Sequence, residues 1–260
     1  MAETSRRARR TSLAMPPQRA VLALDAEGFS RTPSRHQGIL NTTVRDVLAE
    51  AFDRAGLADL WRDCSFPQHT GDGYVVGVPS EYLPLLVHPL MDELDGVLTD
   101  TQPHLAFEDR ALWLRMRAAI GLGPLPDSGG VRPGDGVGSA MTETHRLLDA
   151  APLKAALADS DPEITLLVVG LTARAHEDAV LGGYTALSPR AFRDIEVSHP
   201  AKGYRATGHL YVPRPSVRPR AAASGNAAHE GDATGAAEVA RPAVRRPDPG
   251  TVVFEAVRDV

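Results

Sequence analysis

Features that define several common protein classes are missing from this sequence. A single cysteine, Cys64, excludes an internal disulfide framework, so a reducing cytoplasm is the expected compartment. No apolar run reaches the roughly 18 residues that a membrane-spanning helix needs, so no membrane span is expected. The formal net charge of −5 gives no support to a role in binding nucleic acid.

Two common site motifs are absent as well. No Gly-x-x-x-x-Gly-Lys-Ser/Thr stretch occurs, which argues against a P-loop nucleotide-binding protein. The nine histidines are scattered and none forms a His-x-x-x-His pair, which argues against a helical zinc site. His69 lies next to the glycine-rich turn at residues 70–73. It either contacts a substrate or is an ordinary, partly exposed strand residue.

The composition divides the chain into a core and two tails. Of the 260 residues, 43% are apolar, enough for one hydrophobic core. Residues 1–18 are basic and lack periodicity, so they are expected to be a disordered arm. Residues 214–250 are dominated by Ala, Gly, Pro and Arg and are expected to be a low-complexity linker before a short tail at 251–260.

Hydrophobic periodicity predicts alternating strands and helices within residues 19–213. Apolar spacing of 3.6 residues predicts helices, and β-branched or alternating runs predict strands. The strands are expected at 19–24, 66–78 (a hairpin), 112–120, 162–171 and 204–212. The helices are expected at 37–55, 82–97 and 139–148, with short helical pieces at 57–62, 176–181 and 189–192. This order predicts an α+β fold, with helices covering a mainly antiparallel sheet.

Two aspartates stand at strand ends beside glycine. Asp72 lies in the hairpin turn Thr70-Gly-Asp-Gly73, whose two glycines are expected to adopt positive φ. Asp25 ends the apolar stretch Val21-Leu-Ala-Leu-Asp25. Two such carboxylates can converge on one divalent cation, with their oxygens within roughly 4–6 Å of each other. The alternatives are a solvated hairpin turn for Asp72 and a strand-end cap for Asp25.

Five stretches in chain order carry a family resemblance. They are Asp25-Ala-Glu-Gly-Phe29, Thr70-Gly-Asp72, Arg117-Ala-Ala-Ile-Gly-Leu-Gly-Pro124, Asp135-Gly-Val-Gly-Ser-Ala-Met-Thr-Glu-Thr-His-Arg146 and Lys202-Gly203. Together they resemble the class III nucleotide cyclase domain over nearly the whole core. The resemblance implies a palm-type, ferredoxin-like sheet covered by helices. It also implies a homodimer that converts a nucleoside triphosphate to a 3′,5′-cyclic nucleotide and pyrophosphate.

The resemblance also assigns roles to single residues. Asp25, Asp72 and the carbonyl of Ala26 would hold two Mg²⁺ or Mn²⁺ ions, whose preferred ligands are oxygens. Arg146 would steady charge in the transition state, and Lys202 would neutralise the terminal phosphates. The alternatives are a solvated helix arginine and a simple Lys-Gly turn.

Three positions depart from the family pattern, and a fourth matches some members of it. Thr142 stands where an asparagine orients the ribose, and Gly121 replaces a frequent histidine. Gln68 replaces the base-selecting Lys or Glu, whereas Asp135 matches an acid frequent in adenylate-forming members. A glutamine amide both donates and accepts, so purine choice stays open and pyrimidine cyclisation is not excluded.

These departures leave three hypotheses. The first is an active cyclase. The second is a degenerate cyclase fold that binds a nucleotide or a protein partner without turnover. The third is a structural module in a signalling assembly that recruits partners through residues 214–260.

Overall fold

A seven-stranded sheet organises residues 12–218, the part of the chain that this computed structural model describes. The strands lie in the order β2-β3-β1-β4-β5-β7-β6. Their bounds are β1 Gln18–Ala26, β2 Ser65–His69, β3 Gly73–Pro79, β4 Met116–Pro124, β5 Leu167–Thr172, β6 Arg193–His199 and β7 Tyr204–Tyr211. Every neighbouring pair is antiparallel except β4 with β5, so the predicted α+β fold with a mainly antiparallel sheet is confirmed.

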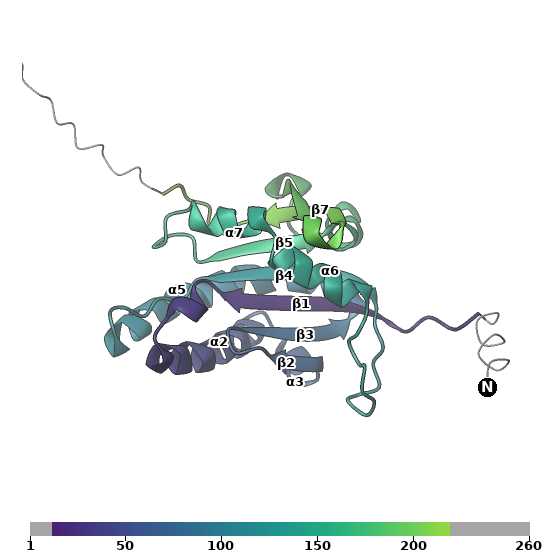
Figure 1. Ribbon diagram of the computed structural model, residues 1–260, viewed down its shortest axis with the longest axis horizontal. Helices are drawn as coiled ribbons and strands as arrows, with labels where there is room; N and C mark the ends of the chain where they lie inside the picture. The colour runs from purple at the N-terminus through teal and green to yellow at the C-terminus, as the bar shows by residue number, and fades with distance from the viewer. Residues whose placement is uncertain (1–11, 219–260) are drawn as a thin grey trace, which may run out of the picture. The chain divides into compact units, whose positions relative to one another are not determined.

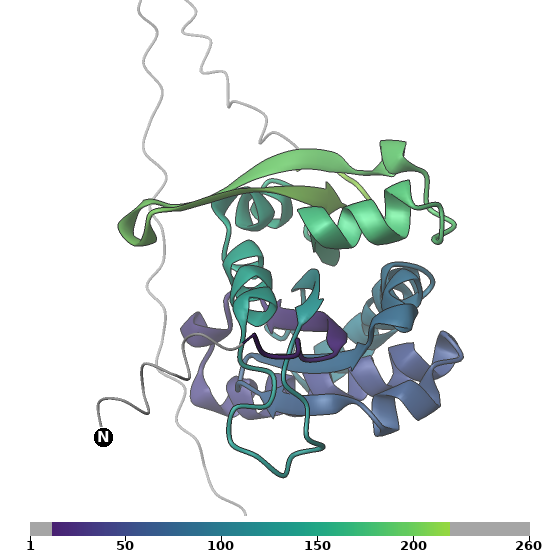
Figure 2. The same cartoon turned by 90° about the vertical axis from the view of Figure 1, so that its right-hand side faces the viewer.

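Helices cover both faces of the sheet (Figure 1 and Figure 2). They are α2 Ser34–Arg54, α3 Ala58–Arg62, α4 Leu83–Val87, α5 Leu90–Glu108, α6 Ser139–Leu148, α7 Ala151–Ala158 and α8 Ala173–His176. Helices α2, α4 and α5 pack in the larger apolar core, and α6 and α7 pack in the smaller one on the opposite face. Strand β1 separates the cores: Leu22 and Leu24 enter the first, Val21 and Ala23 the second.

The helix expected at 82–97 is two helices, and this expectation was wrong in its continuity. Helix α4 ends at Val87, His88 is extended (φ −155°, ψ 129°), and α5 starts at Leu90 and runs to Glu108. Pro89 explains the break, because a proline offers no backbone N–H and disfavours helical geometry in the residue before it. The apolar spacing continues through the break and so concealed it.

Two expected strands begin later than their apolar runs. β4 starts at Met116 rather than at 112, and β5 starts at Leu167 rather than at 162. Leu114 is buried, but its backbone is hydrogen-bonded by the side chain of Gln102, whose amide donates to the Leu114 carbonyl at 2.8 Å. The Leu114 N–H donates in turn to the side-chain amide oxygen of Gln102, Oε1, at 3.2 Å. The Gln102 side chain therefore provides the hydrogen bonds to the Leu114 backbone that a neighbouring strand would otherwise provide.

Two elements were not expected at all. Helix α7 is short and alanine-rich, and β6 contributes only Ile195 and Val197 to the core. Strand β6 adds the seventh strand and forms a hairpin with β7. This hairpin presents Lys202 and its neighbours.

Some expectations fall outside residues 12–218. Most of the arm at 1–18, and the linker and tail beyond Arg218, lie outside the described residues, so the domain boundaries stay predictions. Within the described residues, no helix combines the length and hydropathy needed to cross a bilayer.

Candidate functional site

The fold brings Asp25 and Asp72 together at one end of β1. Strand β1 pairs with β3 in a register that sets Asp25 opposite Gly73. The Ala26 N–H donates to the Asp72 carbonyl at 2.8 Å. The hairpin turn after β2 therefore closes against the end of β1, which places the three residues expected to hold metal in one backbone cluster.

The two glycines of the hairpin turn have different roles. Gly71 adopts φ +91°, as expected, but Gly73 does not have positive φ, so that part of the expectation was wrong. A Cβ on Gly73 would lie 2.0 Å from the Leu24 carbonyl oxygen, so close approach to β1 requires glycine. Asn41 of α2 donates to the Gly71 carbonyl at 2.6 Å and fixes the turn that carries Asp72.

Asp25 already has a cationic partner that sequence reasoning missed. Arg117 of β4 stands directly opposite it and donates through Nε and Nη2 to the two carboxylate oxygens, both at 2.7 Å. Burial raises the pKa of Asp25, and the nearby charge of Asp72 raises it further. The ion pair with Arg117 lowers this pKa but does not cancel the rise. A charged residue inside an apolar strand, level with a strand-end acid, was the available signal.

A second ion pair lies two residues further along, just beyond the ends of the same two strands. Arg115 is 5% exposed and donates to Glu27 at 2.8 Å. Its remaining donors reach the carbonyls of Thr165 and Leu157 and the Ser160 hydroxyl. These contacts tie the turn after Asp25 to the loop before β5 and the end of α7, so they stabilise the end of β1 that carries Asp25.

Arg146 packs on the β6–β7 hairpin, which also carries Lys202. The guanidinium of Arg146 lies over the ring of Tyr204, 4.2 Å from its centroid. His199 Nε2 donates to the Arg146 carbonyl at 2.9 Å. Both contacts come from the β6–β7 hairpin, whose tip between them carries the exposed Lys202. Arg146 and Lys202, two cationic side chains predicted from separate motifs, thus lie on α6 and on the hairpin that packs against it.

The segments that carry Gln68 and Asp135 are in contact through Phe66 and Gly136. Phe66, two residues before Gln68, packs so closely on Gly136 that a Cβ there would lie 2.9 Å from the ring. Gln68 is exposed on β2. Asp135 accepts hydrogen bonds from Ser128 N and Oγ at 3.0 and 2.8 Å and from Gly130 N at 2.9 Å. Its carboxylate therefore stabilises its own loop.

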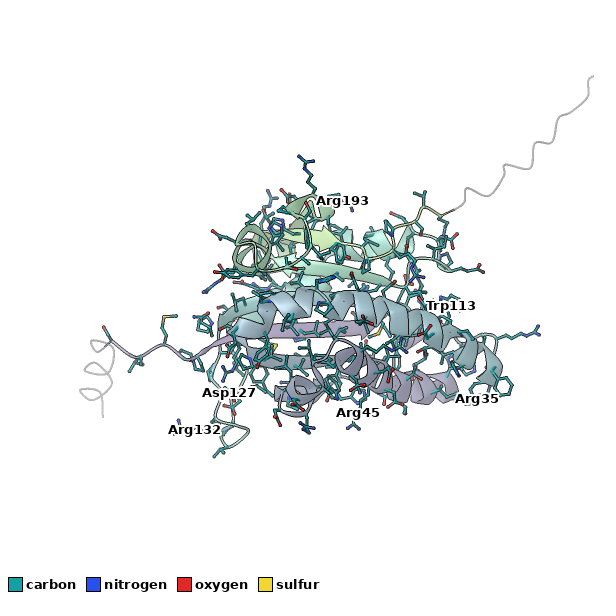
Figure 3. The ribbon with its side chains drawn as sticks, turned by 180° about the vertical axis from the view of Figure 1, so that it is seen from behind. Arg35, Arg45, Trp113, Asp127, Arg132 and Arg193 are labelled. Atoms are coloured by element: carbon teal, nitrogen blue, oxygen red, sulfur yellow. The ribbon has the colours of Figure 1, made fainter. Side chains whose placement is uncertain are left out.

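The loop of residues 126–138 projects beyond the sheet (Figure 1 and Figure 3). Asp127 anchors its base by accepting from Arg19 at 2.9 Å and from Ser65 Oγ at 2.6 Å. Hydrogen bonds from Ser65, Gly129 and Arg19 hold the pKa of Asp127 below its usual value, although partial burial opposes them. The loop leads directly into α6, so Asp127 helps to set where that helix begins.

Thr142 and Gly121, which depart from the family pattern, both have defined contacts within the chain. The Thr142 hydroxyl donates to the Gly138 carbonyl of its own helix turn at 3.1 Å. A Cβ on Gly121 would lie 2.0 Å from the hydroxyl oxygen of the fully buried Thr144. No histidine fits at Gly121 unless α6 moves away from β4.

The two halves of the site are far apart within one chain. Through the strand registers, Asp25 is level with Val168, four residues before Thr172. Thr172 pairs with Gly208, and Tyr204 lies four residues beyond it. At about 3.3 Å per residue, the two ends are separated by on the order of 20–30 Å along the strands. One ligand bound at Asp25 does not reach the guanidinium stacked on Tyr204.

The carboxylates at Asp25 and Asp72 match the oxygen ligands that Mg²⁺ and Mn²⁺ prefer. Within residues 12–218, no three His, Cys, Asp or Glu side chains are arranged to hold a metal ion. Two carboxylates and backbone carbonyls therefore have to be completed by oxygens from elsewhere, such as phosphate or water.

Comparison with known proteins supports the fold. A bacterial light-regulated adenylyl cyclase aligns over 79% of this chain with a TM-score of 0.51 and 11% identity. The adenylyl cyclase CyaB from P. aeruginosa aligns over 78% of this chain and 95% of its own, with a TM-score of 0.50 and 12% identity. The fold is that of the class III nucleotide cyclase domain.

The likeness to this cyclase fold is structural only. The alignment spans 55% of the light-regulated enzyme, so the chain corresponds to about half of that protein. No protein-family model matches the sequence, and no curated protein matches it. The cyclase-like fold is thus established at an identity too low to transfer an activity.

Proposed function

We propose that this chain converts a nucleoside triphosphate to a 3′,5′-cyclic nucleotide and pyrophosphate. The observation that carries the proposal is the meeting of Asp25 and Asp72 at one backbone turn of a cyclase-like fold. In this reaction the ribose 3′ oxygen loses its proton and attacks the α-phosphorus, and the bond to the β-phosphate oxygen breaks. Pyrophosphate leaves with the bonding electron pair.

Asp25, Asp72 and the Ala26 carbonyl are the residues that would hold the divalent cations. Two bound Mg²⁺ or Mn²⁺ ions would supply Lewis-acid activation of the 3′ hydroxyl and neutralise phosphate charge. A cation that takes the Asp25 oxygens now bound by Arg117 would displace that guanidinium. The freed Arg117 guanidinium then stands beside the phosphates and can bind them in a two-point fashion.

Arg146 and Lys202 supply positive charge from the other half of the site. Arg146 has no carboxylate within 4 Å among residues 12–218, and its buried Nε has no hydrogen-bond partner there. A guanidinium left without an anion suits charge that develops during a reaction. Gln68 and Asp135 are the residues proposed to contact the base, and they leave its identity open.

The separation of the two halves supports a homodimer. A two-fold axis would set Asp25 and Asp72 of one copy against Arg146 and Lys202 of the other. The proposed enzyme is a cytoplasmic signalling protein. Its dimer has two identical sites, and each site contains residues from both copies.

One observation favours a second candidate, a nucleotide-binding module without turnover. The Thr142 hydroxyl is bonded to the Gly138 carbonyl and has a shorter reach than the family asparagine. A ribose bound but not oriented would hold its 3′ oxygen away from the α-phosphorus. Partner binding through residues 214–260 is untested, because residues 219–260 lie outside the described residues.

The test is an incubation of the purified chain with each of the four nucleoside triphosphates and Mn²⁺, followed by mass spectrometry for cyclic monophosphates. We expect one or more 3′,5′-cyclic products, abolished in Asp72→Asn. The matched control is Asp46→Asn, which removes an exposed carboxylate on α2. Metal-dependent nucleotide binding with no product in the wild type would support the non-turnover module, and no binding would contradict both.

A further inference from the structure

Arg146 differs from Arg117 in how its charge is held. Arg117 is neutralised by the two oxygens of Asp25. Arg146 has no such partner among the described residues; its neighbour is the aromatic face of Tyr204, 4.2 Å away. An aromatic face attracts a cation without forming hydrogen bonds to its N–H groups. The in-plane donors of Arg146 are therefore left for another acceptor.

The Tyr204 ring is suited to this contact. Burial raises the pKa of the Tyr204 hydroxyl, and nearby Glu143 raises it further while Arg146 opposes them. The ring is thus neutral at physiological pH, and the contact is between a cation and a π system. Glu143 stands one helix turn before Arg146 but forms no ion pair with it within 4 Å.

A second contact from the same hairpin fixes the backbone. His199 donates to the carbonyl of Arg146 at 2.9 Å, and His199 and Tyr204 are themselves paired across β6 and β7. The hairpin therefore holds Arg146 at two points, one on its carbonyl and one on its guanidinium. The contact with the ring face consumes no guanidinium hydrogen-bond donor, although a hydrogen bond between Arg146 and the Tyr204 hydroxyl contributes to lowering the pKa of that hydroxyl.

We propose that Tyr204 is a positioning residue, whose ring holds the Arg146 guanidinium in one orientation with its charge and donors free to meet an incoming phosphate. The effect on turnover rests on the proposed function, whereas the restraint on Arg146 does not. The aromatic face is what acts, so the hydroxyl is dispensable.

The test compares Tyr204→Leu, which removes the aromatic face, with Tyr204→Phe, which keeps it. The matched control is Tyr184→Leu, because Tyr184 is 76% exposed. The first readout is the rate at which phenylglyoxal modifies Arg146, followed by peptide mass spectrometry, with the exposed Arg45 as internal reference. We expect Tyr204→Leu to raise the Arg146 rate severalfold, and Tyr204→Phe and Tyr184→Leu to match the wild type.

The second readout is steady-state turnover in the same four proteins. We expect kcat to fall about tenfold in Tyr204→Leu with a smaller change in KM, because Arg146 acts mainly in the transition state. Tyr204→Phe should restore kcat. Unchanged phenylglyoxal reactivity in folded Tyr204→Leu overturns the inference, as does unchanged kcat in an active enzyme. If the wild type has no turnover, the proposed function fails, and the reactivity of Arg146 alone decides the inference.

Discussion

Asp25 and Arg117 face each other across β1 and β4 and share two hydrogen bonds of 2.7 Å. The carboxylate most suited to bind a divalent cation is thus occupied by the chain's own guanidinium. A cation that binds these oxygens would compete with Arg117, and a polyphosphate would accept a displaced guanidinium. We infer that metal and polyphosphate bind to this protein as a coupled pair.

The first prediction concerns that coupling. Mn²⁺ alone should bind the wild type weakly, and a nucleoside triphosphate should tighten its binding. In Arg117→Gln, Mn²⁺ alone should bind on the order of tenfold more tightly at pH 8, because hydrogen bonds to charged groups contribute about 1.5–3 kcal/mol each. Calorimetric titration with Mn²⁺, with and without nucleotide, measures both effects.

The control for this prediction is Arg205→Gln, since Arg205 forms an exposed ion pair with Glu196 on the β6–β7 hairpin. It should leave Mn²⁺ affinity unchanged. Equal Mn²⁺ affinity in Arg117→Gln and the wild type would mean that the ion pair does not compete with the cation.

The second prediction concerns Thr142. An asparagine here would extend a hydrogen-bonding amide beyond the helix turn to which the threonine hydroxyl is bonded. A positioned hydrogen bond of this kind contributes on the order of 10²–10³ in rate, so Thr142→Asn should raise kcat. Thr42→Asn, an exposed threonine on α2 bonded in the same way to Gly38, is the matched control. No rise in kcat would show that another defect limits turnover.

The third prediction concerns Asp127 and pH. Its pKa is lowered in the folded chain, so its ionised form stabilises the fold above its unfolded pKa near 3.9, and this stability is lost as pH falls through the folded pKa. Asp127→Asn should lower the free energy of unfolding by about 1–3 kcal/mol at pH 7. Urea denaturation from pH 7 to 3 should show the gap between the two proteins closing at the acid end. A gap that is constant with pH would exclude the charge as its cause.

Much of the fold followed from local pattern. Strand β1, helix α2, the β2–β3 hairpin and α6 were predicted because their apolar spacing or glycines encode them directly. Strand β6 was missed because it has only two core residues and is defined by pairing with β7. Pro89 divided a helix whose apolar spacing is continuous on both sides.

The same distinction between local pattern and distant contacts applies to the candidate site. Asp25, Asp72, Arg146 and Lys202 were selected as candidates because each lies in a family motif. Arg117 and Tyr204 were not, because their roles arise from contacts between elements distant in sequence. Periodicity shows which face a residue occupies and does not show which side chain lies opposite it.

The most direct measurement of the central claim is complementation between two inactive variants. Asp72→Ala lacks one half of the site and Arg146→Ala lacks the other. If each site draws on two copies, mixing equal amounts, with unfolding and refolding together to exchange copies, should restore about a quarter of wild-type cyclase activity, because half the dimers are mixed and each carries one intact site. Refolded wild type sets the reference, and each variant refolded alone should stay inactive. A wild type that is active while the mixture stays inactive would contradict a site shared between two copies.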